Sequence, residues 1–229
     1  MTTDPAISAL AALDDTLRRG MYAYIRRARR PVTRDEAAAS VGISRKLAAF
    51  HLDKLVDAGL LRARYEPVGG IRKVGRTPKV YEPTETDIRV TIPERRHEVL
   101  AEILMDAVLA EREGESARQA AIRVAARRGA DIGAAERART KPGRLGAERA
   151  LTLLEGMLAR HGFEPGRESP TCVRLRNCPF HPLAARAPEL VCAVNHAFLD
   201  GILTGLEATR VRAVLAPRHG ECCVELRSS

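Results

Sequence analysis

The sequence has no tryptophan, and aromatic residues of all kinds make up only 3% of its 229 residues. Because 45% of the residues are still hydrophobic, we expect a helix-rich globular protein with a core of Leu, Val, Ile and Ala. No apolar run reaches the roughly 18 residues that cross a bilayer, and the opening MTTDPAIS lacks the basic start and apolar stretch of a signal peptide. We therefore expect a cytoplasmic protein with no membrane partner.

Motifs for nucleotide chemistry are also missing. The chain contains neither GxGxxG nor a P-loop, and its cysteines form no CxxC pair. Cys178 and His181 could be read as a nucleophile and its base, but no orienting acid or oxyanion-stabilising group accompanies them. The sequence therefore predicts a protein that is not an enzyme.

Positive charge is concentrated towards the N-terminus. The net charge is +9; residues 1–90 hold 17 Lys and Arg against 11 Asp and Glu, whereas residues 91–229 hold 21 against 18. An excess of cations on one domain favours a polyanionic partner. We place the domain boundary after residue 88, with a domain that binds the polyanion at 1–88 and a second domain at 89–229.

The N-terminal pattern predicts short helices joined by a tight turn. Apolar residues recur at helical spacing over residues 6–28, and Pro31 ends that helix. Thr33, with Glu36 three residues later, has the capping-box arrangement of a helix start. Gly42 suits the turn that follows, because it accepts a positive φ, and Ser44 then caps the next helix.

The helix that begins at Ser44 is predicted to bury Leu52 and Leu55 and to leave its N-terminal face exposed. A helix that enters the major groove of DNA contacts bases mainly through N-terminal residues, and Arg pairs with guanine. Arg45 is therefore the leading candidate for base contact. The predicted DNA-contacting residues of these helices are Thr33, Ser44, Arg45, Lys46, Ala49, Phe50 and His51.

Two strands, at 60–65 and 79–82, are predicted to follow, with Arg72, Lys73 and Arg76 on the loop between them. The stretches HLDKLVDAGLL and GRTPKVYEPT resemble the ArsR/DeoR-type winged helix-turn-helix transcription regulators, although Thr77 separates Arg76 from Pro78. The resemblance implies double-stranded DNA as partner. A homodimer is expected, since operators of such proteins are usually two-fold symmetric. A winged helix that contacts only proteins is the alternative.

The C-terminal part is predicted to be an α+β sensor domain with a small antiparallel sheet, so that the whole chain is mainly α within an α+β class. Helices are expected from about 99 to 108, from 115 into the 120s, at 147–160 and at 187–208. Strands are expected near 170–177, 210–217 and 221–227.

Five cysteines, Cys172, Cys178, Cys192, Cys222 and Cys223, lie in this part, with histidines between them. In a reducing cytoplasm such a group favours a metal or redox site over disulfides. We expect Cys192 near a helix start, where the helix dipole lowers a thiol pKa. Adjacent Cys222 and Cys223 should point to opposite faces of a strand, so only one of them should reach a shared site.

The thirteen residues between Cys178 and Cys192, with a third cysteine far downstream, resemble the SufR-type iron-sulfur regulators. The resemblance implies that Cys178, Cys192 and Cys222 hold an iron-sulfur cluster that governs DNA binding, with His181 or His196 as candidate fourth ligands. Zinc held by Cys178, His181, Cys192 and His196 is an alternative. A small organic ligand, or cysteines that only pack, are others. The sequence thus predicts a sequence-specific regulator, acting as a repressor.

Overall fold

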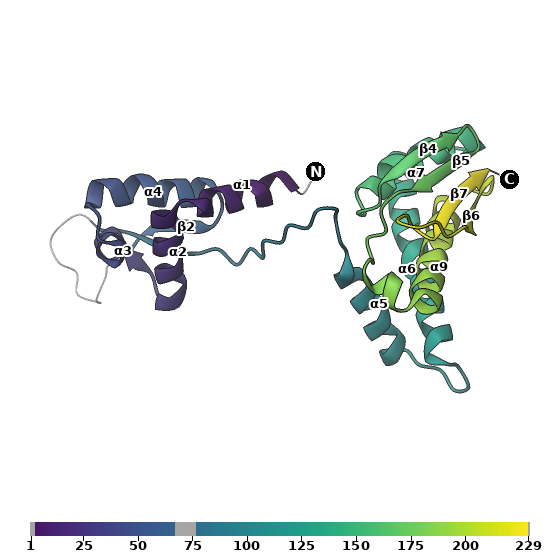
Figure 1. Cartoon of the computed structure of the whole chain (residues 1–229), viewed down its shortest axis with the longest axis horizontal. Coiled ribbons are helices and arrows are strands. Elements are labelled where there is room, and N and C mark those ends of the chain that lie inside the picture. The colour runs from purple at the N-terminus through teal and green to yellow at the C-terminus, as the bar shows by residue number, and fades with distance from the viewer. Residues whose placement is uncertain (1–2, 67–76, 229) are drawn as a thin grey trace. The chain divides into compact units, whose positions relative to one another are not determined.

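The structure, a computed structural model, describes residues 3–66 and 77–228 and divides the chain into two compact units, Met1–Val90 and Thr91–Ser229 (Figure 1). The expected boundary, after residue 88, lies two residues earlier. The chain is mixed α+β with small antiparallel sheets. Arg72, Lys73 and Arg76, which we assigned to the loop between two strands, lie outside the described residues.

Unit 1 combines four helices with a three-stranded antiparallel sheet of order β1-β3-β2 in its described part. Its elements are α1 (Thr3–Asp14), α2 (Thr16–Ala28), β1 (Val32–Thr33), α3 (Arg34–Val41), α4 (Arg45–Asp57), β2 (Leu61–Tyr65) and β3 (Lys79–Pro83). The sequence did not predict β1, because a strand of two residues leaves no alternation to detect. It pairs with β3 through Val32 and Tyr81.

The single helix predicted over residues 6–28 is wrong, because the chain forms two helices there. Asp15 interrupts them with an extended backbone, and its side chain accepts a hydrogen bond from the amide of Arg18 at 2.9 Å. An N-terminal cap of this kind satisfies an amide that a new helix leaves free. The aspartate hidden in the apolar pattern was the available signal.

The predicted junction of α3 and α4 is confirmed. Thr33 and Glu36 form both hydrogen bonds of a capping box, and Gly42 ends α3 with a φ of 69°. Ser44 caps α4 by accepting a hydrogen bond from the amide of Leu47 at 3.3 Å. Leu52 of α4 then packs in the core of unit 1.

Unit 2 pairs helices with a four-stranded antiparallel sheet of order β4-β5-β7-β6. Its elements are α5 (His97–Leu109), α6 (Ala117–Thr140), α7 (Ala147–Ala159), β4 (Pro165–Ser169), β5 (Cys172–Leu175), α8 (Leu183–Arg186), α9 (Pro188–Leu206), β6 (Val211–Leu215) and β7 (Val224–Ser228). β4, sequence PGRES, was not predicted, since it contains proline and glycine and shows no apolar alternation. The α6 helix extends well beyond the predicted 120s.

Glycines allow α6 and α9 to lie side by side at very close range (Figure 1). A Cβ added to Gly129 or Gly133 of α6 would lie within 3.0 Å of backbone atoms of α9. Gly201 and Gly205 of α9 meet the backbone of α6 in the same way. The two helices therefore form a rigid support for the residues that α9 carries.

Among the described residues, one helix, α9, is long and apolar enough by length and composition to cross a membrane. Of that apolar stretch, 56% is buried inside unit 2. Such burial is the pattern of a core helix, since a membrane span presents its apolar surface to lipid. A cytoplasmic location stays a prediction.

Candidate functional site

The N-terminal end of α4 presents polar and aromatic side chains to the surface. Ser44, Arg45 and Lys46 are exposed, Ala49 is half-buried, and the ring of Phe50 is 55% exposed. Phe50 is therefore not a core residue of the described part of unit 1. The helix buries its opposite side, so the predicted face is available for contact.

Arg45 is held by the preceding helix without being removed from solvent. Its Nε lies 3.1 Å from a carboxylate oxygen of Asp35, and both side chains are about two-thirds exposed, at 68% and 65%. An exposed pair of this kind contributes little to stability and is easily exchanged for another anion. Thr33 differs from Arg45 in that its side chain is already used within unit 1. Its hydroxyl accepts a hydrogen bond from the Glu36 amide in the cap of α3.

His51, which we placed on the exposed face, lies in the core instead. It is 6% exposed, its Nδ1 is 4.0 Å from Asp15, and that nitrogen has no hydrogen-bond partner among the described residues. Its position three residues after buried Ala48 is the spacing of an inward-facing helix side, which was the signal for this burial. We remove His51 from the DNA-contacting set.

Three of the cysteines of unit 2 line one cavity, and a fourth, Cys222, is buried next to one of them in sequence. Cys178 lies in the loop after β5, Cys192 on α9, and Cys222 and Cys223 in the segment just before β7. Cys178, Cys192 and Cys223 line a cavity of about 490 Å³. The topology thus brings together three segments that are far apart in sequence.

Neighbouring thiols and burial raise the pKa of Cys178 and of Cys222. A hydrogen bond with Cys222, followed by burial, raises the pKa of Cys178 far above its ordinary value of 9.0. The hydrogen bond with Cys178 lowers the pKa of Cys222, but Cys223 and burial outweigh it and raise that pKa to about 12. Metal binding at such thiols must release protons.

Cys192 departs from its prediction. It lies in the second turn of α9, which begins at Pro188, and burial raises its pKa, although a hydrogen bond with Cys223 acts in the opposite direction. The expectation of a lowered pKa is wrong, because desolvation of the thiolate exceeds the effect of the helix dipole at this depth. Cys192 is the only half-buried member of the group.

Asn195 of α9 supports the most deeply buried thiol. Its Nδ2 donates a hydrogen bond to Sγ of Cys222 at 3.1 Å, and both residues are fully buried. Its Oδ1 has no hydrogen-bond partner among the described residues. An amide donor aimed at sulfur stabilises a thiolate or a metal-bound thiolate more than a neutral thiol.

The two histidines proposed as fourth ligands have different surroundings. His181 lines the cavity, and so does His219. His196 does not, because its Nε2 lies 3.1 Å from the carbonyl oxygen of Ala213 on β6. The alternative zinc site of Cys178, His181, Cys192 and His196 is therefore not assembled in the described part of unit 2.

The loop that follows β5 and contains Cys178, called the cysteine loop below, is hydrogen-bonded to the segment just beyond Val90. Arg95 donates to the carbonyl oxygen of Cys178 at 2.9 Å, and the amide of Arg96 donates to that of Pro179 at 2.9 Å. Asn177 donates to the carbonyl oxygen of Glu94 at 3.0 Å. This segment is only a few residues beyond Val90, so the loop is tied to the start of unit 2.

The spacing of the thiols tests which metal centre they fit. In the described residues, no three of these cysteines bring their sulfur atoms within 4.8 Å of one another. Two thiolates on one zinc ion, each at about 2.3 Å, cannot lie more than about 4.6 Å apart. A cluster whose irons are ligated by separate thiolates tolerates the wider spacing. The spacing therefore disfavours a single ion shared by three of these thiols, and by itself it identifies no cofactor.

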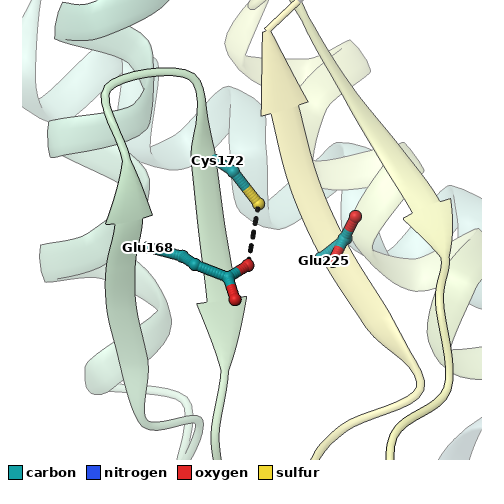
Figure 2. A group of neighbouring side chains, drawn as sticks. All are labelled: Glu168, Cys172 and Glu225. Atoms are coloured by element: carbon teal, nitrogen blue, oxygen red, sulfur yellow. Dashed lines mark hydrogen bonds between the residues drawn. The ribbon is translucent and has the colours of Figure 1, made fainter.

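A second group, Glu168, Cys172 and Glu225, has spacing that could hold a metal ion (Figure 2). Its charges are already matched: Glu168 pairs with Arg218 at 2.7 Å, and buried Glu225 pairs with Arg174 and Arg227. A cation would have to displace these arginines. The group is better explained as an ion-pair network that joins β4, β5 and β7, and no cofactor is identified by it.

Comparison with known proteins adds no relative. No family model matches this chain. Nor does any curated protein or any solved structure.

Proposed function

We propose that the protein is a sequence-specific DNA-binding transcription regulator, acting as a repressor, whose DNA affinity depends on an iron-sulfur cluster in unit 2. Unit 1 would be its winged helix-turn-helix. The support is the order of its elements: α3 and α4 joined at Gly42, followed by the antiparallel pair β2 and β3.

The observation that carries the DNA-binding proposal is the open N-terminal face of α4. Arg45 and Lys46 are exposed where a groove-bound helix places its base and phosphate contacts, and the helix N-terminus adds a favourable dipole for phosphate. Phe50 adds an apolar surface suited to thymine methyl groups. The opposite side of α4 packs in the core of unit 1, so the N-terminal face is held towards solvent.

Cys178, Cys192 and Cys222 are the thiols proposed to hold the cluster. When bound, the cluster would add redox and oxygen sensitivity to a site that is otherwise built of neutral thiols. The chain itself supplies ligands from the loop after β5, from α9 and from the segment before β7. Ligation would fix these three segments relative to one another.

The link between the two activities is the hydrogen-bonded contact of the cysteine loop with Glu94–His97. The Nε2 atom of His97 lies 2.9 Å from the carbonyl oxygen of His181, which adds a contact to those of Arg95 and Arg96. A shift of the loop on ligation would move the backbone that leads into unit 1. A cluster with different affinity for two arrangements would then change DNA affinity.

We propose a homodimer that uses α5. Met105, Val108 and Leu109 are 56%, 71% and 78% exposed within about one turn of this helix. Three large apolar side chains together on a surface are typical of an interaction site. A second copy is the proposed occupant, because a two-fold operator requires two readers related by the same symmetry.

Anaerobic reconstitution of the full chain with iron and sulfide, followed by a DNA-binding assay on promoter fragments, tests the function. We expect visible charge-transfer absorption, bound iron and sulfide, and a DNA complex that weakens with salt. Protein that takes up no iron would remove the cluster from the proposal. Protein that binds no duplex in either state, at low salt, would remove the regulator.

A further inference from the structure

We propose that Cys223 is a fourth thiol ligand, so that Cys178, Cys192, Cys222 and Cys223 form a closed, all-cysteine site. This inference rests on the proposed cluster and assigns its ligands. It replaces the histidines as candidates for the fourth position.

The cavity gives the first reason. Cys223 lines it together with Cys178 and Cys192, so three thiols from three separate segments share one space. Cys222 adjoins Cys223 in sequence and is fully buried, and its sulfur accepts a hydrogen bond from Asn195 of α9, the helix that also carries Cys192. The fold therefore brings the segments that carry the four thiols together around this cavity.

The backbone explains how two adjacent residues can both take part. The sequence-based expectation that Cys222 and Cys223 face opposite sides assumed a strand, but β7 begins only at Val224. The amide of Cys222 donates to the carbonyl oxygen of Leu175 on β5, and the carbonyl oxygen of Cys223 accepts from the amide of Ala216. Both residues are thus fixed by neighbours on either side, with Cys222 in the core and Cys223 at the wall of the cavity.

Cys222 keeps its place as a ligand when Cys223 is added. The amide group of Asn195 donates to its sulfur at 3.1 Å, in a fully buried position where no water can compete. Such a bond is suited to a sulfur that carries negative charge after ligation. Each of the four thiols would release its proton to solvent as its sulfur binds iron.

His181 is the competing fourth ligand, since it also lines the cavity. Its described hydrogen bonds use the backbone: its amide donates to Cys178, and its carbonyl oxygen lies against His97. Cys223 lines the cavity with Cys178 and Cys192 and offers a thiolate, the usual protein ligand of iron-sulfur clusters. The arrangement of the group therefore favours Cys223.

The test uses anaerobically reconstituted full-length protein and compares Cys223→Ser with Cys172→Ser. Cys172 is a matched control, because it is a cysteine of the same unit, buried to a similar degree, that does not line the cavity. Iron and sulfide per chain are measured, and iron loss to a chelator is followed by absorbance. We expect Cys223→Ser to lose iron more than about tenfold faster than wild type, and Cys172→Ser to match wild type.

Three controls separate the possible outcomes. Thermal melts of the metal-free variants, together with Cys223→Ala, show whether faster iron loss reflects a lost ligand or a poorly folded chain. If Cys223→Ser and Cys223→Ala hold iron as wild type does while Cys222→Ser does not, the fourth thiol is wrong but the cluster stands. If His181→Ala releases iron and both Cys223 variants retain it, the histidine is the ligand. If wild type binds no iron, the cluster itself fails as well.

Discussion

The guanidinium of Arg95 donates a hydrogen bond to the carbonyl oxygen of Cys178 at 2.9 Å and another to the side chain of Asn177. Arg95 lies five residues beyond the last residue of unit 1, and Cys178 is a proposed cluster ligand. One side chain thus joins the segment that follows unit 1, the proposed DNA-binding unit, to the loop that carries a proposed cluster ligand. Since Arg95 contacts the backbone of Cys178 and not its thiol, replacing Arg95 removes no proposed ligand.

Replacing Arg95 with Ala should separate metal binding from DNA binding. We expect iron content to stay at the wild-type level, while the ratio of DNA affinities with and without the cluster falls from the several-fold difference typical of coupled sites towards one. Fluorescence anisotropy on a duplex selected with wild-type protein measures both affinities.

Arg89→Ala is the control, because Arg89 belongs to the same stretch of chain but pairs only with nearby Asp87 among the described residues. It should leave the ratio unchanged. Should Arg95→Ala keep the full ratio, the contact with Cys178 would have no part in the coupling.

Local chemistry explains which features of unit 1 could be predicted. Thr33 with Glu36, Gly42 and Ser44 act through neighbours in sequence, and each was confirmed. Asp15 and His51 had local signals too, but each was outweighed in the sequence: Asp15 caps α2 inside an apolar repeat, and His51 is a polar residue three positions after buried Ala48.

The thiol site shows a different limit of prediction from the sequence. The sequence identified Cys178, Cys192 and Cys222 through a resemblance, but the place of Cys223 depends on where β7 begins and on which carbonyl its neighbour reaches. The contact of Arg95 with Cys178 spans 83 residues, so no local pattern could indicate it. The same holds for Asn195 and Cys222.

Glu36 should make the stability of unit 1 sensitive to acid. A hydrogen bond from Arg30, opposed by burial and assisted by Thr33, lowers the pKa of this carboxyl from 4.5 to about 2. Because the folded-state pKa is lowered, the stabilisation is complete above pH 4.5 and is lost as pH falls towards 2. Glu36→Gln should therefore cost about 1–2 kcal/mol at pH 7, with a shrinking difference in acid.

Urea unfolding at pH 7, 5 and 3 measures this effect. Glu85→Gln is the matched control, since Glu85 is an exposed carboxylate of the same unit. A difference between Glu36→Gln and wild type that stays constant down to pH 3 and below would show that the ion pair is not its source.

The close packing of α6 and α9 predicts opposite effects for two Gly to Ala changes. At Gly201 an added methyl group would meet the backbone of Ala126, so the helices must separate, and we expect a loss of roughly 1–3 kcal/mol. At Gly156 of α7 the nearest atom is 3.9 Å away, on the side chain of Arg160. There alanine should stabilise the helix by about 0.5–1 kcal/mol. Thermal unfolding of unit 2 in the full chain compares them, and equal effects would contradict the close approach.

The proposed dimer can be tested on α5. Val108→Lys places a charge in the exposed apolar group and should raise the dimer dissociation constant by about tenfold or more. Leu215→Lys is the control, because Leu215 is also an exposed apolar residue of unit 2, at 51%, but lies on β6. Light scattering across a concentration series gives the mass. Dissociation by Leu215→Lys alone would move the interface to the sheet.

Replacing Arg45 with Ala and replacing Lys46 with Ala should change DNA binding in different ways. If Arg45 reads a base, its loss should cost about 1–3 kcal/mol at one base pair and relax the preference there. Loss of Lys46, as a phosphate contact, should weaken binding to all sequences equally and lower the salt dependence by about one unit. Arg149→Ala removes the same charge from an exposed position on α7 of unit 2 and should change neither. Selection from a random duplex library measures preference. A uniform loss for Arg45→Ala would make it a phosphate contact and would leave base reading to other residues of α4.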